Sequence, residues 1–454
     1  MPNPLLLPEF RELLTEGNTE TLTELMSDMH PASIAEFSEG LDVDETWQLL
    51  SYAPIERQAE VFSFYPTENQ EELVSDVGRE RMSSLLEAMS HDDRVDLLKQ
   101  LDEDVVESLL PLVARADRED IRKLMSYPEH TAGAVMTTDY ATLPADATVS
   151  EALSLLRRQA PNAETIYYVY VVDKDRHLVG FVSLQDLILA RPTALVRDIM
   201  QPEVVCVAVE QDREEVAQEL AKYDFLAIPV VDEQNRLVGI VTHDDVADVM
   251  EAEATEDFHL AAAVTPLIRG YGQSGVWSLY RRRIGWLLML VFVSLLSSGV
   301  IEAYEEVLHS VIALAFFLPL LIDSGGNTGS QASTLIVRAL ATDEVDPKQL
   351  MQIVWKELSV GLSLGVTMAV ASFFLAMFRG GFDVGLIVGI SMLCIVLTSN
   401  LLGVMLPFLL SKLRVDPAVA SSPLITTVAD VLGLLLYFVV ATQMMAWLGT
   451  LERL

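Results

Sequence analysis

The sequence is poor in cysteine and in basic residues, and each shortage excludes a class of protein. Its 454 residues include two cysteines, Cys206 and Cys394, which lie in very different segments and in no metal-ligand spacing. We therefore interpret both as unpaired packing residues in a reducing compartment. The sequence has 30 basic residues and 66 acidic ones. So acidic a surface repels nucleic acid and anionic lipid headgroups, and it attracts cations or basic partners.

Catalytic motifs are missing as well. No phosphate-cradling glycine loop follows a strand, no metal-ligand pair lies in the polar part, and no nucleophile has a partnered base. The glycine-rich SGGNTG at 324–329 is not a Walker loop, because no lysine follows it. The N-terminal segment has no basic region and no cleavage site, so we expect no signal peptide and a cytoplasmic N-terminal part. These shortages predict a protein that is not an enzyme.

The chain divides into two unlike parts. Residues 284–454 hold 12 acidic and 7 basic residues, whereas residues 1–283 hold 54 acidic and 23 basic ones. In the apolar part, five segments are long enough to cross a bilayer, which takes roughly 20 residues. They are expected at 284–303, 311–338, 353–378, 383–410 and 419–447. An acidic soluble part is thus joined to a membrane domain of five helices.

Basic residues in the short connections predict the orientation. Arg281 to Arg283 precede the first span, and further basic residues lie near the loop after the second span and after the fourth: Arg338, Lys348, Lys356, Lys412 and Arg414. The opposite side keeps only Arg379 and Arg453. By the positive-inside rule, the N-terminus is inside and the C-terminus outside. We expect a multi-pass protein of a bacterial inner membrane.

Polar residues inside the spans are the candidate ion site. Asp430 lies within the fifth span, with Thr426 one helical turn before it. The second span carries a polar stripe at helical spacing: Asp323, Asn327, Gln331 and Thr334. A carboxylate at membrane depth is costly unless it faces a protein interior or a wet cavity. For Asp430 this favours a pore site, whereas for Asp323 a role in helix packing is an equal alternative.

The chemistry of these residues suits a hard, hydrated cation. Mg²⁺ gives up its water reluctantly and is usually held through water by one or two carboxylates. The spans contain no thiolate or imidazole cluster that would suggest zinc or copper. Five helices of one chain are too few to surround an ion pathway that contains a single carboxylate. This favours a homodimer that places two Asp430 side chains on one axis. The residues alone do not rank Mg²⁺ against Mn²⁺, Co²⁺ or Ca²⁺.

The middle of the chain contains an internal repeat. LVGFVSLQDL at 178–187 matches LVGIVTHDDV at 237–246, and the residues before each copy match as well. Each unit is predicted to contain a helix, a strand, a tight turn with an aspartate, a second strand and a helix. The pattern resembles a tandem CBS domain. That resemblance implies a sensor that often binds ATP or another adenine nucleotide, although a purely structural dimerisation module remains open.

Residues 5–130 have no strand pattern. They read as short amphipathic helices that stack into a superhelical array with acidic residues on its surface. Between the repeat and the membrane part, MEAEATEDFHL at 250–260 places Glu253, Glu256 and Asp257 on one helix face. Such carboxylates repel one another unless a cation or a group of another subunit neutralises their charge. We interpret this connector as a gating element rather than as a plain solvated linker.

Together these features resemble the MgtE family of bacterial magnesium channels over nearly the whole chain. The most specific motifs are SGGNTGSQAS in the second span and PLITTVADVLG in the fifth. The resemblance implies a dimer whose second and fifth spans line the pore, with Asp430 holding Mg²⁺ and Asn327 beside it. Ser422 stands where some members have asparagine. It also implies that cytoplasmic Mg²⁺ closes the pore by bridging acidic residues, here Asp92, Asp96, Asp212, Glu214, Asp224, Asp245, Asp248, Glu253, Glu256 and Asp257.

The prediction is therefore a multidomain protein: a superhelical α-helical N-domain, an α/β tandem CBS domain and an all-α five-helix membrane domain. The expected bounds are 1–130 for the N-domain, 131–193 and 194–252 for the CBS units, 253–280 for a connecting helix and 281–454 for the pore domain. The expected function is uptake of Mg²⁺ through a channel that cytoplasmic Mg²⁺ closes. The alternative is a cation-coupled secondary transporter, in which Asp430 or Asp323 would titrate.

Overall fold

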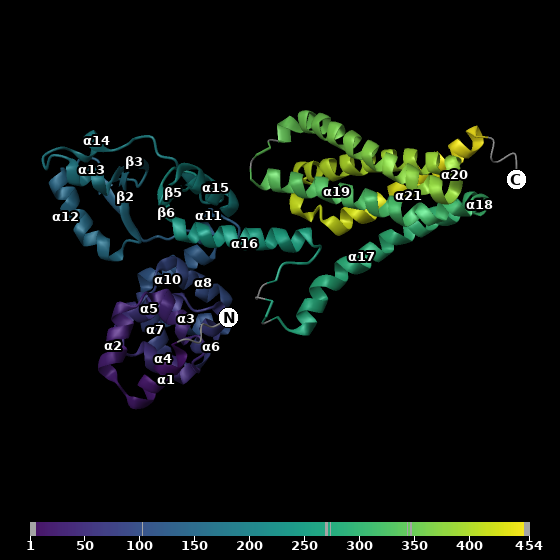
Figure 1. Ribbon diagram of the computed structural model, residues 1–454. Helices are drawn as coiled ribbons and strands as arrows, with labels where there is room; N and C mark the ends of the chain where they lie inside the picture. Colours follow the sequence, from purple (N-terminus) through teal and green to yellow (C-terminus); the bar gives the residue numbers. More distant parts are fainter. Residues whose placement is uncertain are drawn as a thin grey trace. The chain divides into compact units, whose positions relative to one another are not determined.

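The computed structural model describes residues 6–101, 103–267, 271–272, 274–342, 344–345 and 347–448. It divides into two compact units, Met1–Glu251 and Ala252–Leu454, and each is described by itself (Figure 1).

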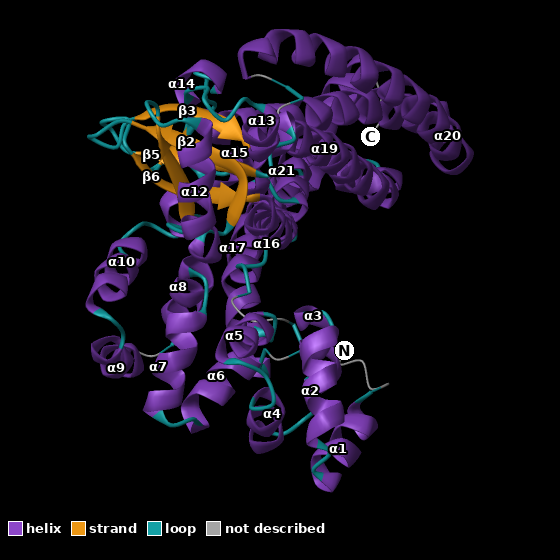
Figure 2. Ribbon diagram, turned by 90° about the vertical axis from the view of Figure 1, so that its left-hand side faces the viewer, coloured by secondary structure: helices purple, strands orange, loops and turns teal. Residues whose placement is uncertain are grey.

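The first unit begins with a stack of short helices (Figure 2). They are α1 (Leu7–Glu16), α2 (Thr19–Asp28), α3 (Pro31–Ser38), α4 (Val43–Leu50), α5 (Ile55–Ser63), α6 (Thr67–Asp76), α7 (Arg79–Ala88), α8 (His91–Gln100), α9 (Glu103–Leu109), η1 (Leu110–Leu112) and α10 (Arg115–Met125). Their apolar faces form one core that includes Leu22, Ile34, Leu49, Phe62 and Leu85. The predicted array of amphipathic helices is confirmed, since no strand interrupts it within the described residues up to Met125.

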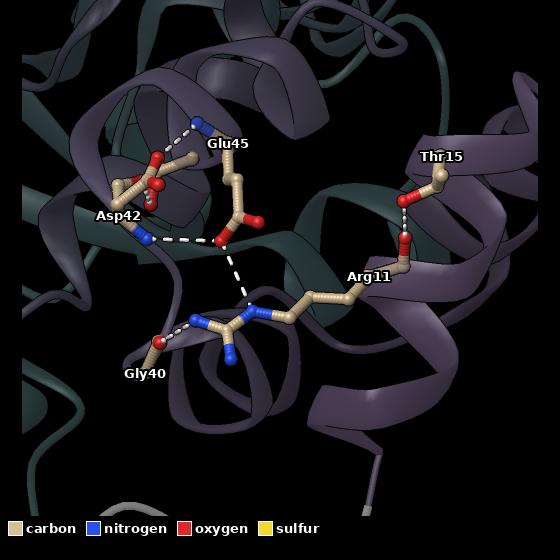
Figure 3. A network of polar contacts seen from close by, with 6 residues as sticks. Arg11, Thr15, Gly40, Asp42 and Glu45 are labelled. Carbon is tan, nitrogen blue, oxygen red and sulfur yellow. Dashed lines mark hydrogen bonds and ion pairs between the residues drawn. The ribbon is translucent and has the colours of Figure 1, made fainter.

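Local contacts define where two of these helices begin or end. Asp42 and Glu45 form a capping box at the start of α4, in which each side chain accepts the other's backbone N–H. Figure 3 shows that Glu45 also accepts from Arg11 Nε at 3.2 Å, while the same guanidinium donates to the Gly40 carbonyl at 2.9 Å. The contacts tie α1 to α4 across the stack. Gly17, in the left-handed conformation, ends α1.

The CBS pair follows, with two copies of one unit. The first contains α11 (Ala132–Val135), β1 (Tyr140–Pro144), α12 (Val149–Gln159), η2 (Ala160–Asn162), β2 (Thr165–Val172), β3 (Leu178–Ser183) and α13 (Leu184–Leu189). The second contains α14 (Val196–Ile199), β4 (Val207–Ala208), α15 (Arg213–Tyr223), β5 (Ala227–Val231), β6 (Leu237–Thr242) and α16 (His243–Ala261). In each sheet the first strand pairs parallel with the second, which pairs antiparallel with the third. The predicted repeat is confirmed.

The two hairpin turns of the CBS pair also face each other. Leu178 N–H donates to the Asn235 carbonyl at 3.0 Å, and Leu237 N–H donates to the Arg176 carbonyl at 3.0 Å. Arg176 and Asn235 both have a positive φ, as tight hairpin turns require. The reciprocal bonds join the two sheets into one module. In addition, Val95 of α8 and Leu124 of α10 are buried in one cluster with apolar residues of the second sheet, so the helical array is docked on the CBS pair.

The second unit is helical. After the end of α16 it contains α17 (Val276–Ala303), α18 (Glu305–Ser310), η3 (Ile312–Phe317), α19 (Leu318–Ala341), η4 (Pro347–Gln349), α20 (Leu350–Lys412), η5 (Pro417–Val419) and α21 (Ser422–Trp447). Four stretches of the described residues are long and apolar enough to cross a membrane: Val276–Ala303, Ile312–Ala341, Leu350–Lys412 and Ser422–Trp447.

One of these stretches, α20, contains two membrane segments. Gly381 breaks its helical geometry with φ 83° and ψ 179°, and the chain reverses there. Gly361 packs against Asn400, and Gly389 packs against Phe373, so the two halves run antiparallel side by side. The structure therefore has the five apolar segments that the sequence predicts, with a turn in place of a loop between the third and the fourth.

The connector differs from its predicted bounds of 253–280. Its acidic helix α16 begins at His243 and ends at Ala261, and α17 begins at Val276, ahead of the expected 284. At the helix entrance, Thr242 Oγ1 lies 2.6 Å from both Asp244 Oδ1 and Asp245 Oδ2 and donates its one proton to either of them. Asp245 Oδ2 also accepts the Thr242 backbone N–H at 3.3 Å. The helix cannot extend through Pro266, and Gly275 caps the next one.

Candidate ion pathway and acidic sensor site

The polar stripe of the second span lies on one face of a helix, and that face does not pack against the rest of its own chain. Asp323, Asn327, Gln331 and Thr334 lie on α19, and all four are exposed in the single chain. Asn327 Nδ2 donates to Asp323 Oδ2 at 3.2 Å, which holds the carboxylate and the amide together. An exposed carboxylate and amides on a membrane helix cannot face hydrocarbon, because their hydrogen-bonding groups would be left unsatisfied.

Asp430 lies beside this stripe. It is half-buried on α21, and its carboxylate is within electrostatic range of Asp323. The close approach of the two helices depends on Gly326, where a Cβ would come within 3.1 Å of Thr426 Cγ2. Thr426 Oγ1 donates to the Pro423 carbonyl at 3.0 Å, so its lone pairs remain available as acceptors. The structure thus brings Asp430, Thr426 and Asp323 to one part of the bundle, as the sequence predicts.

Ser422 takes part in a different contact. Its Oγ donates to Ser330 Oγ at 2.9 Å, and Ser330 Oγ also lies 3.4 Å from the Ser422 carbonyl. The hydroxyl therefore ties the start of α21 to α19.

Sequence reasoning missed a second polar pair in the membrane domain. Asn400, which is buried, donates from Nδ2 to the Glu357 carbonyl at 2.9 Å and to Glu357 Oε2 at 3.1 Å. The pair joins the two halves of α20. The sequence did not indicate this pair, because Glu357 is a single glutamate near the start of a span and Asn400 lies 43 residues away.

The acidic connector lies near the ends of the membrane helices within the second unit. Burial and the neighbouring carboxylates of Asp416, Glu253 and Glu256 together raise the pKa of Asp257 to about 6, against the pull of Arg338. Asp416 belongs to the segment between α20 and α21, and Arg338 to the last turn of α19. The predicted crowding of carboxylates on this helix is therefore present, and it extends to Asp416.

A second group of carboxylates lies where the helical array meets the second CBS unit. Burial and the nearby Asp92 raise the pKa of Asp245 to about 9, even though Thr242 donates two hydrogen bonds to it. Asp92 Oδ1 is shielded from solvent and has no hydrogen-bond partner among the described residues. Partial burial and the charges of Glu251, Asp244 and Asp93 raise the pKa of Asp248. Such an excess of negative charge fits a bound divalent cation.

The same group includes carboxylates that no sequence pattern marked. Burial and the nearby Asp92, Asp244, Asp139 and Asp93 raise the pKa of Glu164 to about 7. Glu164 follows η2 of the first CBS unit, and its N–H donates to the Asp139 carbonyl at 2.7 Å. These residues come from four separate stretches of sequence, so only the docking of the array on the CBS pair assembles them.

Asp96 belongs to this group as well. Burial and the nearby charges of Asp92 and Asp93 raise its pKa to about 6 despite Lys99, whose Nζ lies 3.9 Å from Asp96 Oδ1. Three further predicted ligands lie at the two ends of α15. Asp212 caps α15 by accepting the Glu214 N–H at 2.8 Å, whereas Asp224 ends the same 11-residue helix in a left-handed conformation. At 1.5 Å per residue, Asp224 lies about 18 Å along the helix axis from Asp212 and about 15 Å from Glu214.

A small cavity lies between the two CBS sheets. It is lined mainly by aromatic and aliphatic side chains: Tyr168, Tyr170, Phe181, Val204, Val205, Phe225, Ala227 and Pro229. Within the described part of the chain, the buried Tyr170 hydroxyl there has no hydrogen-bond partner. Aromatic faces beside a hydroxyl are a lining that can stack on a flat ring and hydrogen-bond to it.

Comparison with known proteins now decides the family. The chain is 43% identical to "Magnesium transporter MgtE" of Thermus thermophilus over 442 residues, which are 96% of this chain and 98% of the relative. It is 35% identical to the protein of the same name from Bacillus subtilis over 95% of both chains. This chain belongs to the MgtE family of magnesium transporters. It is accordingly a membrane transporter of divalent cations and not an enzyme.

Family models match each part of the chain. A divalent cation transporter model, MgtE, matches 318–440, the MgtE intracellular N domain matches 29–130, and CBS domains match 132–192 and 196–252. Among solved structures, the soluble part of a magnesium transporter is 37% identical with a TM-score of 0.53, covering 55% of this chain and 98% of that one. The cytosolic domain of the Mg²⁺ channel MgtE in complex with ATP is 41% identical with a TM-score of 0.51, covering 54% of this chain and 100% of that one.

Proposed function

We propose that this MgtE-family chain forms a homodimeric Mg²⁺ channel that cytoplasmic Mg²⁺ closes. The observation that carries the proposal is the polar stripe on α19, exposed in the single chain and adjacent to Asp430. A second copy placed against this face would cover the stripe and enclose a wet path between two pairs of carboxylates. The path would hold a hydrated ion mainly through water, as Mg²⁺ prefers.

Closure would depend on the crowded carboxylates described above. The docked array places Asp92, Asp245 and Glu164 together with too few positive charges, which is costly unless a cation binds. The connector contains a similar group of crowded carboxylates, which includes Asp257 and Asp416. An ion that binds the compact form more tightly than the loose form shifts the equilibrium toward the compact form. Rising cytoplasmic Mg²⁺ would therefore stabilise the compact, closed form.

The topology and domain bounds belong to the same proposal. The basic residues beside the spans favour an N-terminus inside and a C-terminus outside an inner membrane. The family matches support an N-domain near 1–130, CBS units near 131–193 and 194–252, and a membrane domain beyond the acidic helix.

The CBS pair is proposed to bind ATP or another adenine nucleotide. A related cytosolic domain at 41% identity was solved with ATP. In this chain, the buried Tyr170 hydroxyl would gain a partner, and Phe181 and Phe225 would flank the ring. Loss of ATP binding on Phe225→Ala, with unchanged folding, is the expected result of a titration.

The alternative is a transporter that couples another cation to uptake. Purified protein in liposomes separates the two, because a channel passes current in proportion to the driving force without a proton gradient. We expect Mg²⁺ current at rates above a carrier's turnover, with Mn²⁺, Co²⁺ and Ca²⁺ measured in parallel. Flux that requires a proton gradient and saturates at carrier rates would overturn the channel proposal.

A further inference from the structure

The first two turns of α17 differ in charge from the rest of the protein. Between Asp257 and Glu302 the sequence contains no acidic residue, in a chain that has 66 of them. The same stretch contains Arg281, Arg282 and Arg283 in succession. Arg281 and Arg283 are exposed, and among the described residues neither guanidinium is paired with a carboxylate. A strongly acidic chain therefore presents a positive surface at this place.

The length of α17 places this surface beside the lipid headgroups. The helix has 28 residues, which make it about 42 Å long, whereas the hydrocarbon core of a bilayer is about 30 Å thick. Residues 284–301 contain no charged side chain and extend over about 27 Å, so they nearly fill that core. The preceding residues 276–283 therefore lie in the headgroup layer when the helix crosses the membrane.

No other part of the membrane domain packs tightly on this end of the helix. None of the residues of α17 is buried, and Val300 and Ile301, which pack against the core of the domain, lie at its far end. Trp277 and Tyr280 are 68% and 49% exposed, and their rings stack with centroids 5.1 Å apart. Exposed tryptophan and tyrosine at the end of a span are typical of the membrane–water interface.

Helical spacing brings each of the two exposed arginines beside one of these rings. Trp277 and Arg281 are four residues apart, and Tyr280 and Arg283 are three apart, so each pair shares a face of the helix. The surface therefore combines two guanidinium groups with two amphipathic rings. We call these four side chains the α17 basic–aromatic face.

Arg282 lies on the opposite side of the helix and has a different role. Its guanidinium donates to the Pro266 carbonyl, and its own carbonyl accepts the Thr265 N–H at 3.2 Å. These contacts tie the start of α17 to the segment that follows the acidic helix α16. Whatever binds the α17 basic–aromatic face therefore also holds the end of the connector.

We propose that the α17 basic–aromatic face binds the headgroup of an anionic phospholipid in the cytoplasmic leaflet. A guanidinium presents its N–H groups in a fork that matches two phosphate oxygens, and the rings place their polar edges at the same depth. The overall charge of the chain predicts repulsion of such a lipid, so this face is a local exception. The proposal rests on insertion of α17 in the membrane and not on ion conduction, and its test therefore measures lipid instead of flux.

The end of α20 provides a matched control. Lys412 and Arg414 have the same spacing as Arg281 and Arg283, and both are exposed. They lack a stacked aromatic pair, and the acidic Asp416 follows two residues after the second of them. We therefore expect this second basic pair to contribute little to the binding of anionic lipid.

The test titrates the full-length protein in detergent with phosphatidylglycerol and counts bound lipid by native mass spectrometry, with phosphatidylcholine as the zwitterionic comparison. The joint change Arg281→Gln and Arg283→Gln should weaken phosphatidylglycerol binding about 30-fold, as expected for two arginines at an anionic membrane surface. Arg281→Lys with Arg283→Lys should lose less, because the charge is kept and only the fork is lost. Lys412→Gln with Arg414→Gln should behave as wild type.

Four results would overturn the proposal. They are equal binding of the two lipids by the wild type, wild-type affinity in the glutamine variant, an equal loss in the control variant, and displacement of the lipid by inorganic phosphate, which would indicate a site for a soluble anion. If the glutamine variant does not fold, brominated lipids test the wild type itself. Brominated phosphatidylglycerol should quench Trp277 more than brominated phosphatidylcholine does, measured as the difference from Trp277→Phe, and equal quenching would refute the preference.

Discussion

Replacing Asp245 by asparagine is expected to stabilise the docked sensor in the absence of Mg²⁺, which is the opposite of the usual result of removing a helix-capping carboxylate. Burial and Asp92 raise the pKa of Asp245 to about 9 in the docked form, from an ordinary value of 3.8. At pH 7 the carboxyl of Asp245 is therefore protonated in the docked form and ionised in the undocked form. The raised pKa means that docking weakens as pH rises from about 4 toward 9.

The size of the effect follows from that shift. Taking up a proton at pH 7 by a carboxyl of pKa 3.8 costs about 4 kcal/mol, at 1.36 kcal/mol per pH unit. Asp245 keeps some contact with solvent, which reduces the figure to about 2 kcal/mol. Asparagine needs no proton, so the variant avoids this cost, although it loses about 1 kcal/mol of capping. The net gain corresponds to a several-fold larger docked population.

Limited proteolysis of the full-length protein measures that population, with cleavage between α10 and α11 as the readout. Asp186→Asn is the control, because Asp186 holds the equivalent position in the first CBS unit and accepts from Ser183 Oγ at 2.6 Å. We expect Asp245→Asn to be protected without Mg²⁺ and to gain little from it, while the control behaves as wild type. Equal or faster cleavage of Asp245→Asn at zero Mg²⁺ would refute the reasoning.

Three other outcomes are expected. Asp430→Ala should abolish Mg²⁺ uptake into liposomes while the dimer still assembles, and Asp430→Asn should fare nearly as badly because the amide keeps the shape without the charge; near-normal flux in either would contradict the pore assignment. Joint replacement of Glu253, Glu256 and Asp257 by alanine should leave a channel that stays open at high internal Mg²⁺ in patch recordings, whereas a variant that stays shut at every concentration would mean that repulsion holds the wild type open. The Mg²⁺ concentration that half-protects the sensor should fall by about tenfold per unit as pH rises from 6 to 8, because an ion that displaces the proton of Asp245 competes with it; a concentration independent of pH would exclude that carboxyl as a ligand.

Much of the architecture was accessible from sequence because periodicity and repetition are local. The matched segments at 178–187 and 237–246 predicted two alike hairpins, and the structure confirms both. Uninterrupted apolar length predicted the membrane segments, and spacing by three and four placed Asp323 and Asn327 on one face. At the connector the sequence marked only the acidic run, whereas the helix that carries it, α16, begins at His243.

The remaining parts depend on contacts between distant stretches. Glu164 and Asp92 are 72 residues apart and meet only because the helical array docks on the CBS pair. Asp212 and Asp224 were both expected to be ligands, and α15 separates them. The sequence pattern of one segment does not predict which residues of a distant segment will contact it in the folded protein.

The reversal at Gly381 has a consequence for how the protein enters the membrane. Its φ of 83° with ψ near 180° is a conformation that essentially only glycine adopts, and other residues there cost about 1–3 kcal/mol. With no loop between them, the third and fourth segments have to be inserted together as a helical hairpin. We therefore expect Gly381→Val to lower the amount of protein that reaches the membrane, while the molecules that do arrive conduct normally. Selection at this position would act on biogenesis and not on the passage of ions.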